Sequence, residues 1–221
     1  MNLKLEAARE ALKDVRNGAR LGLGTGSTAE EFVRLLGEAL HTGELRDIRC
    51  TCTSRRTEEL ARELGIATFS LGELAPLDLA VDGADEIDER LRLIKGRGGA
   101  LLREKIVEQS ADRFIVIADE SKVVERLGVG VLPVEVTPFA REVLLRRFVD
   151  YQPVLREGFI TDEGNLIIDV RVPEDQDVML VAGFVRAHAG VVETGFFGGE
   201  VTEAVIAGPQ GVRRMRRRPS S

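Results

Sequence analysis

The sequence contains few of the side chains on which disulfide, zinc and histidine chemistry depend. It has two cysteines and two histidines in 221 residues. Cys50 and Cys52 lie one residue apart with no further Cys or His nearby, which excludes a disulfide framework and a zinc site. We expect both to be small apolar residues of one strand in a protein of the reducing cytoplasm. His41 and His188 have no nucleophile motif beside them, so we expect packing or surface roles.

Long apolar runs and an excess of positive charge are also missing. No run approaches the roughly 20 apolar residues that span a bilayer, and the N-terminal MNLKLEAARE is charged where a signal peptide is apolar, so neither membrane insertion nor secretion is expected. The net charge of −6 argues against a general nucleic-acid binder. We predict that the one basic run is a solvated tail without a role; it consists of Arg213, Arg214, Arg216, Arg217 and Arg218.

Strand and helix patterns alternate along the first part of the chain. Ser27 and Thr28 are each followed three residues later by a glutamate, which predicts a doubled capping box at the start of one helix. The alternation predicts a Rossmann-like, mostly parallel sheet covered on both faces. Strands are expected before Gly24 and near 48–53, 77–82, 91–95 and 113–118, and helices near 5–15, 27–40, 54–64 and 99–110.

From Val131 the predicted order changes to strand, helix, strand, strand, helix, strand, which is the ferredoxin-like order. The strand-like segment 203–208 then returns to the first sheet. We therefore predict an α/β protein with a smaller ferredoxin-like α+β domain inserted into a Rossmann-like domain. The expected domains are residues 1–130 plus 203–221 for the Rossmann-like catalytic part and residues 131–202 for the insertion.

A glycine-rich loop connects the first strand to the helix that follows it. Residues 22–28 (GLGTGST) offer backbone N–H groups, hydroxyls and a helix N-terminus, which suit a phosphate; a tight strand-to-helix turn is the alternative. A dinucleotide fingerprint would need glycine in place of Ser27, and a nucleoside-triphosphate loop would need lysine in place of Gly26. NAD and ATP are therefore disfavoured.

Charged side chains follow other strands at the edge where ligands of parallel sheets bind. Residues 81–88 (VDGADEID) form a run of carboxylates, which a solvated acidic turn would also explain. Residues 95–100 (KGRGGA) add a cation and small residues that let backbone approach a ligand. Glu104 either projects toward that edge or is a surface residue paired with a neighbouring base, and Lys122 is either a further cation at the edge or an exposed loop residue.

Five segments occur in the order GLGTGSTAEEF, AVDGADEID, LIKGRGGALLREKI, ADESKVV and LPVEV. Together they strongly resemble the ribose-5-phosphate isomerases of type A, over nearly the whole chain. The resemblance implies an aldose-ketose isomerase that interconverts D-ribose 5-phosphate and D-ribulose 5-phosphate in the pentose phosphate pathway, without a metal or organic cofactor. It also implies a homo-oligomer, with a dimer favoured, and we expect no nucleic-acid or membrane partner.

The resemblance also implies roles for particular residues. Glu104 would be the proton acceptor, and Lys95, Asp82 and Asp85 are the other catalytic candidates. Arg97 interrupts the family's glycine run; either its side chain points outward while its N–H serves the substrate, or it adds a phosphate contact. The residues expected to line the substrate site are Thr25, Gly26, Ser27, Thr28, Asp82, Gly83, Ala84, Asp85, Lys95, Gly96, Arg97, Gly98, Lys122 and Lys4.

We hypothesise that Glu104 moves a proton between adjacent sugar carbons through an enediolate, and that Lys95 and backbone N–H groups stabilise the enediolate oxygen. Other functions stay open at this point. The acidic run would suit Mg²⁺ in phosphoryl transfer or hydrolysis, because hard cations favour carboxylate oxygens. A sugar-phosphate sensor would need the loop but no base, and a related sugar-phosphate deaminase or lactonase would share the fold.

Overall fold

The computed structural model describes residues 2–217, which form two compact units. The described residues of unit 1 are 2–84, 103–122 and 199–217, and unit 2 consists of Asp85–Leu102 and Val123–Gly198. Unit 2 thus contains more than the predicted insertion. The reason is a small sheet in which β5 (Leu93–Ile94) pairs with both β4 (Glu86–Ile87) and β11 (Phe196–Phe197), which joins residues 85–102 to the end of the insertion.

Unit 1 contains the predicted Rossmann-like sheet. Its order is β13-β12-β6-β3-β1-β2, and every pair is parallel except β12 with β13 at one edge. The carboxyl ends of the parallel strands therefore share one edge of the sheet. The strands are β1 (Arg20–Leu23), β2 (Arg49–Cys52), β3 (Leu79–Asp82), β6 (Phe114–Asp119), β12 (Glu203–Gly208) and β13 (Gly211–Arg216).

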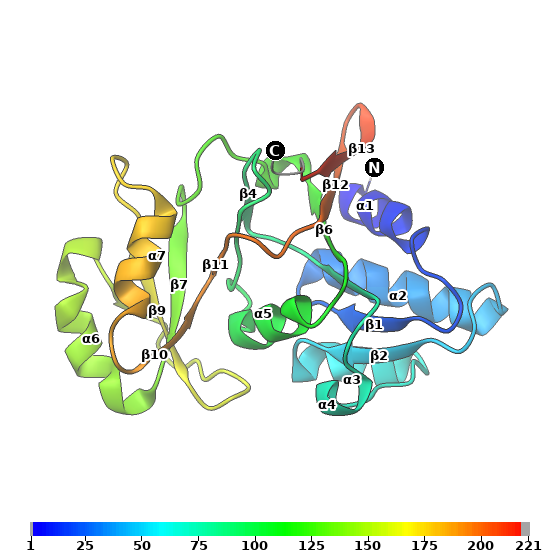
Figure 1. The fold of residues 1–221 in the computed structure, drawn as a ribbon, viewed down its shortest axis with the longest axis horizontal. Coiled ribbons are helices and arrows are strands. Elements are labelled where there is room, and N and C mark those ends of the chain that lie inside the picture. The colour runs from blue at the N-terminus through cyan, green and yellow to red at the C-terminus, as the bar shows by residue number, and fades with distance from the viewer. Residues whose placement is uncertain (1, 218–221) are drawn as a thin grey trace. The chain divides into compact units, whose positions relative to one another are not determined.

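Helices cover both faces of this sheet (Figure 1). α1 (Leu3–Leu12), α2 (Ser27–Thr42) and α3 (Arg55–Glu63) share one apolar core with the strands, whereas α4 (Leu71–Leu74) and α5 (Leu101–Gln109) pack through Leu74 and Val107 in a second cluster. Gly22 lets α5 approach β1, since a Cβ there would lie 2.6 Å from Val107 Cγ1. α1 begins where the Asn2 side chain accepts a hydrogen bond from the Leu5 N–H at 3.3 Å.

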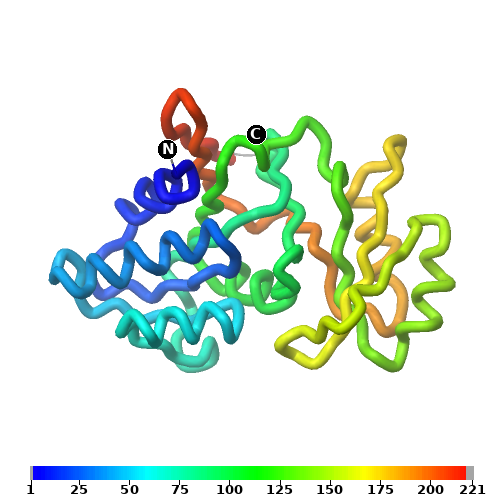
Figure 2. The backbone as a smooth tube through the Cα atoms, turned by 180° about the vertical axis from the view of Figure 1, so that it is seen from behind, coloured from blue at the N-terminus to red at the C-terminus, as the bar shows by residue number. Residues whose placement is uncertain are grey.

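The described C-terminal arginines lie in or next to an edge strand, so the prediction of a solvated tail was wrong. β13 pairs with β12 along its whole length, and the hairpin, red in Figures 1 and 2, lies beside α1. Arg214 is within 3.1 Å of Glu10, 2.8 Å of Asp14 and 3.2 Å of Glu203. These acids lie far from Arg214 in the sequence, so a local charge pattern does not reveal them. Arg218 lies outside the described residues.

We expect Arg214→Met to lower the free energy of unfolding at pH 7 by about 2 kcal/mol, because Glu10, Asp14 and Glu203 each lose one of the cations with which they pair. The effect should be smaller than for a fully buried pair, since the Arg214 side chain is 23% exposed. Urea unfolding followed by circular dichroism measures this change. Arg213→Met, at an exposed position of the same strand, is the matched control and should change the free energy by less than about 0.5 kcal/mol.

The difference between the wild type and Arg214→Met should depend on pH. Burial raises the pKa of Asp14, but hydrogen bonds from Arg113 and Arg214 outweigh it and hold the pKa below its ordinary value. A carboxyl with a depressed folded pKa stabilises the protein above its unfolded pKa, about 3.9, and loses this contribution as the pH falls through the folded pKa. The difference should therefore shrink below about pH 4. A difference that is constant down to about pH 3 would contradict this origin.

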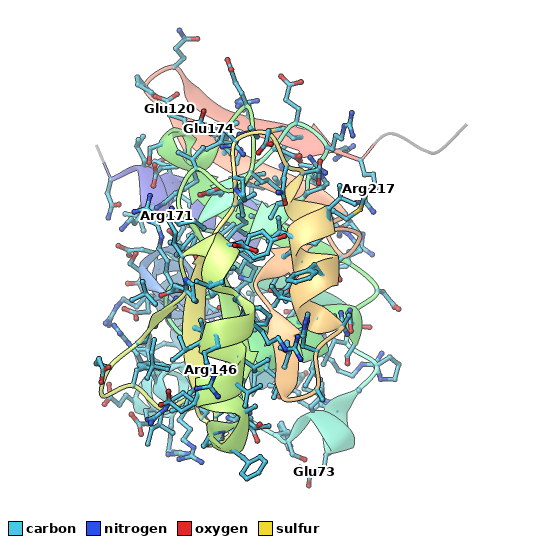
Figure 3. The ribbon with its side chains drawn as sticks, turned by 90° about the vertical axis from the view of Figure 1, so that its left-hand side faces the viewer. Glu73, Glu120, Arg146, Arg171, Glu174 and Arg217 are labelled. Carbon is cyan, nitrogen blue, oxygen red and sulfur yellow. The ribbon has the colours of Figure 1, made fainter. Side chains whose placement is uncertain are left out.

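Unit 2 contains the predicted ferredoxin-like arrangement. Its four-stranded sheet has the order β10-β7-β9-β8 with antiparallel pairs throughout. Figure 3 shows α6, from which Arg146 projects, beside α7 on one face of this sheet. The elements are β7 (Val131–Val136), η2 (Pro138–Ala140), α6 (Arg141–Arg147), η3 (Val149–Tyr151), β8 (Val154–Leu155), β9 (Leu166–Arg171), α7 (Val178–Arg186) and β10 (Val191–Thr194). In the part of the chain described, from residue 2 to residue 217, no helix is both long and apolar enough to cross a membrane.

Candidate active site

The glycine-rich loop of unit 1 is tied to the end of β3 by a buried carboxylate. Asp82 Oδ1 accepts hydrogen bonds from the Thr25 N–H at 2.9 Å and from the Gly83 N–H at 2.6 Å. Gly24 makes this approach possible, because a Cβ at that position would overlap the Asp82 carboxyl group. The structure thus brings the loop and Asp82 together at the carboxyl edge of the sheet.

The doubled capping box predicted at Ser27 and Thr28 is not formed. The N-cap of α2 is Gly26, whose φ of 108° is open to glycine and strained for other residues, and α2 has no side-chain cap bond. Ser27 Oγ instead accepts a hydrogen bond from Lys4 Nζ at 2.8 Å, and Glu30 pairs with Arg56 at 2.7 Å. The loop conformation places Gly26, rather than a hydroxyl residue, at the cap.

One ammonium group bonds the N-terminus of α2, and a second follows the neighbouring strand β6. Lys4 bonds Ser27, and Lys122 belongs to η1 (Glu120–Lys122), directly after β6. Burial raises the pKa of Asp119, but hydrogen bonds from Ser121 and the charges of Lys122 and Lys4 outweigh it and hold the pKa below its ordinary value. A helix N-terminus with an ammonium group bonded to its first residue is suited to an anion.

A cluster of hydroxyl groups supports the loop, and sequence reasoning missed it. Thr25 Oγ1 lies 2.7 Å from Thr53 Oγ1, 2.8 Å from Ser54 Oγ and 3.1 Å from Thr57 Oγ1. Thr57 Oγ1 donates to the Gly24 carbonyl oxygen at 2.9 Å. The available signal was that Thr53 and Ser54 directly follow β2, at the same edge of the parallel sheet as the loop.

Unit 2 holds the lysine-bearing turn. The Lys95 N–H donates to the Gly195 carbonyl oxygen at 2.9 Å, and the Lys95 side chain is 2% exposed with Nζ 5.7 Å from the centre of the Phe197 ring. Asp85 Oδ2 accepts the Arg97 N–H at 2.9 Å. Arg97 is exposed, and its N–H is used by Asp85, so this amide is part of the turn's own structure.

Glu104 lies in the first turn of α5 and is 4% exposed. The alternative of a surface glutamate is therefore wrong. α5 also buries Lys105 and Glu108. Carboxylates are rarely buried unless they have partners or a chemical role, so the burial of Glu104 keeps it a candidate for a proton-transferring group in unit 1, although burial alone does not distinguish it from Glu108.

The cysteines and His188 have packing roles. Burial raises the pKa of the Cys52 thiol to about 12 and also raises the pKa of Cys50, so neither is a thiolate near neutral pH. His188 Nδ1 lies 2.9 Å from the Phe184 carbonyl oxygen, and its ring packs edge-on against Phe148. Among residues 2–217, no three His, Cys, Asp or Glu side chains are grouped so as to hold a metal ion.

The residues predicted for the site are distributed over both units. Those in unit 1 are Lys4, Thr25, Gly26, Ser27, Thr28, Asp82, Gly83, Ala84, Glu104 and Lys122, and those in unit 2 are Asp85, Lys95, Gly96, Arg97 and Gly98. Within unit 1, hydrogen bonds join the loop to Asp82 and Lys4 to Ser27; within unit 2, a hydrogen bond joins Asp85 to the turn.

A mostly parallel sheet with a glycine-rich loop and a buried carboxylate at one edge, in a chain that also has a ferredoxin-like unit, places the chain among the α/β enzymes. The family model of ribose 5-phosphate isomerase A (phosphoriboisomerase A) matches residues 49–211. A ribose-5-phosphate isomerase A of Sinorhizobium medicae is 48% identical over 97% of both chains, and one of Agrobacterium fabrum is 46% identical over 97% of both.

Two solved structures are also similar to the chain over nearly its full length. A D-ribose-5-phosphate isomerase in complex with phospho-erythronic acid matches with a TM-score of 0.93 and 40% identity, over 98% of this chain and 100% of that one. The ribose 5-phosphate isomerase A of Methanocaldococcus jannaschii matches with a TM-score of 0.91 and 40% identity, over 97% and 98% of the two chains. The chain belongs to the ribose 5-phosphate isomerase A family.

Proposed function

We propose that the protein is an isomerase that interconverts D-ribose 5-phosphate and D-ribulose 5-phosphate in the pentose phosphate pathway. Membership of the family supports this function, and so do relatives that bear this name over nearly the full length of the chain. The observation that carries it is the burial of Glu104 in the first turn of α5, since moving a proton between adjacent carbons needs a shielded carboxylate as the base.

The phosphate of the substrate binds to the glycine-rich loop. Support comes from the N-terminus of α2 at Ser27, with Thr28 beside it, and from the ammonium groups of Lys4 and Lys122. A relative was solved with phospho-erythronic acid, which is likewise a small phosphorylated acyclic compound. Binding of this remote group positions the reacting carbons, so ribose without phosphate should lose rate as well as affinity.

Glu104 takes the proton from C2 of the open-chain aldose and returns it to C1. The hydroxyl proton of O2 passes to O1, so the carbonyl group moves from C1 to C2 with no change in composition. The intermediate is an enediolate whose negative charge sits on oxygen, and Lys95 together with backbone N–H groups stabilises that charge. Asp82 and Asp85 hold sugar hydroxyls, and one of them assists the opening of the furanose ring.

We further propose that the enzyme is a cytoplasmic homodimer that needs no metal or organic cofactor. Apolar side chains exposed on η2, α6 and α7, among them Phe139, Val143 and Leu180, support an association between copies. Light scattering of the purified protein should give twice the mass of one chain; the mass of a single chain would reject the dimer.

The decisive experiment incubates the purified protein with ribose 5-phosphate in EDTA and follows the formation of ribulose 5-phosphate. Isomerisation without release of phosphate supports the proposal. Activity that disappears in EDTA and returns with Mg²⁺, or release of phosphate, would support a metal-dependent phosphoryl enzyme instead. Parallel assays with allose and glucosamine phosphates separate the isomerase from a related enzyme of different specificity, and binding without turnover would identify a sensor.

A further inference from the structure

Arg156 bonds two consecutive carbonyl groups of the lysine-bearing turn. Its Nη1 donates to the Gly96 carbonyl oxygen at 2.8 Å and to the Arg97 carbonyl oxygen at 3.0 Å. The other edge of the guanidinium group is held by Asp169 of β9, with Nε to Oδ2 and Nη2 to Oδ1 both at 2.7 Å. Because this bidentate pair is mostly shielded, with Arg156 17% exposed, the guanidinium plane has a defined orientation.

These bonds determine which way the turn presents its amides. A trans peptide holds its C=O and N–H groups on opposite sides. The Gly96 carbonyl points to Arg156, so the Arg97 N–H points away from it and meets Asp85. The Arg97 carbonyl also points to Arg156, so the Gly98 N–H is directed away from the guanidinium group. Gly98 is exposed and belongs to the residues expected to line the substrate site.

We propose that Arg156, oriented by Asp169, is a positioning residue that sets the direction of the Gly98 amide in the turn after Lys95. The expected effect on catalysis rests on the proposed function, whereas the effect of Arg156 on the conformation of the turn does not. Only arginine can bond Asp169 and both carbonyl groups of the turn at once. Its planar guanidinium group binds the carboxylate through Nε and Nη2 and leaves Nη1 for the two carbonyls, whereas a lysine ammonium group is a single point of charge.

Arg156→Met tests the proposal with two readouts. Hydrogen-deuterium exchange, measured by mass spectrometry on a peptide that includes residues 95–100, should become roughly tenfold faster, because the turn loses two of the hydrogen bonds that hold it in place. The kcat for ribose 5-phosphate should fall about 10- to 100-fold with KM changed less than about threefold, because a misplaced Gly98 N–H would stabilise the transition state less while affecting substrate binding little. Exchange and kcat both unchanged would overturn the proposal.

The matched control is Arg92→Met. Arg92 has a similar exposure of 19%, lies in the same unit and pairs with Asp88 at 2.7 Å, and its guanidinium group also bonds Asp177 rather than the turn. We expect a comparable loss of stability with exchange in residues 95–100 and kcat within about threefold of the wild type. If Arg92→Met and Arg156→Met affect exchange and kcat equally, Arg156 has only a structural role and the proposal is wrong.

A double variant separates positioning from stability. Arg156→Met leaves the Asp169 carboxylate without its cation, and adding Asp169→Asn removes that charge. The free energy of unfolding measured in urea should then return toward the wild-type value while kcat stays low. If kcat recovered together with the stability, Arg156 would not be a positioning residue. If the wild type does not isomerise ribose 5-phosphate, the proposed function fails, and the exchange measurement alone decides whether Arg156 holds the turn.

Discussion

Glu104→Gln should lower kcat for ribose 5-phosphate by about 10² to 10⁴, with a much smaller effect on KM. Glutamine has the same shape and keeps an acceptor oxygen, but it does not take up a proton at neutral pH. Glu104 is 4% exposed, so the nearby solvent offers little water to replace it as a base. Initial rates of ribulose 5-phosphate formation measure the loss.

The control for this variant is Glu108→Gln. Glu108 lies one turn further along α5 and is equally buried, at 2% exposed, so the same loss of charge is made in nearly the same surroundings. A proton-transfer role confined to Glu104 requires that Glu108→Gln keeps kcat within about tenfold of the wild type. Incorporation of deuterium from D₂O into C1 or C2 of the sugar gives a second readout. Near-wild-type incorporation in Glu104→Gln would remove this residue from the role of base.

Much of the fold could be predicted because its determinants are local in the sequence. Alternating strand and helix patterns predicted the parallel sheet, and the ferredoxin-like order after Val131 matches β7 to β10 with α6 and α7. The glycine-rich loop and the acidic run were expected at one sheet edge because both follow parallel strands. The contact between Asp82 and Thr25 is a direct consequence of that topology.

Other features depend on partners that are distant in the sequence. The short strands β4 and β5 are two residues long, too short for a periodic pattern, and their pairing with β11 shifts residues 85–102 into unit 2. In the sequence Arg214 belongs to a charged run typical of a tail, and only the fold brings it next to Glu10 and Asp14. Arg156 likewise has no local motif, because its role depends on Asp169 and on the backbone of a turn 60 residues away.

Gly24→Ala should lower kcat/KM by roughly 10² or more, although it adds only one methyl group. The Cβ would overlap the Asp82 carboxyl group, so either the carboxylate or the loop must move. Asp82 then loses its bonds to the N–H groups of Thr25 and Gly83, so the loop loses the side-chain part of its link to β3. Crowding of this kind should also lower the free energy of unfolding by about 1–3 kcal/mol. Steady-state kinetics and urea unfolding measure the two effects.

Gly72→Ala is the matched control for this crowding. Gly72 lies in α4 of the same unit, and a Cβ there would meet nothing within 4 Å, so the same methyl group should leave kcat/KM and the urea midpoint close to the wild type. The contrast isolates the contact with Asp82 from the general effect of replacing a glycine. If Gly24→Ala retained kcat/KM within about threefold, the close packing of the loop against Asp82 would not be needed for the reaction, and the assignment of this edge to substrate binding would have to be abandoned.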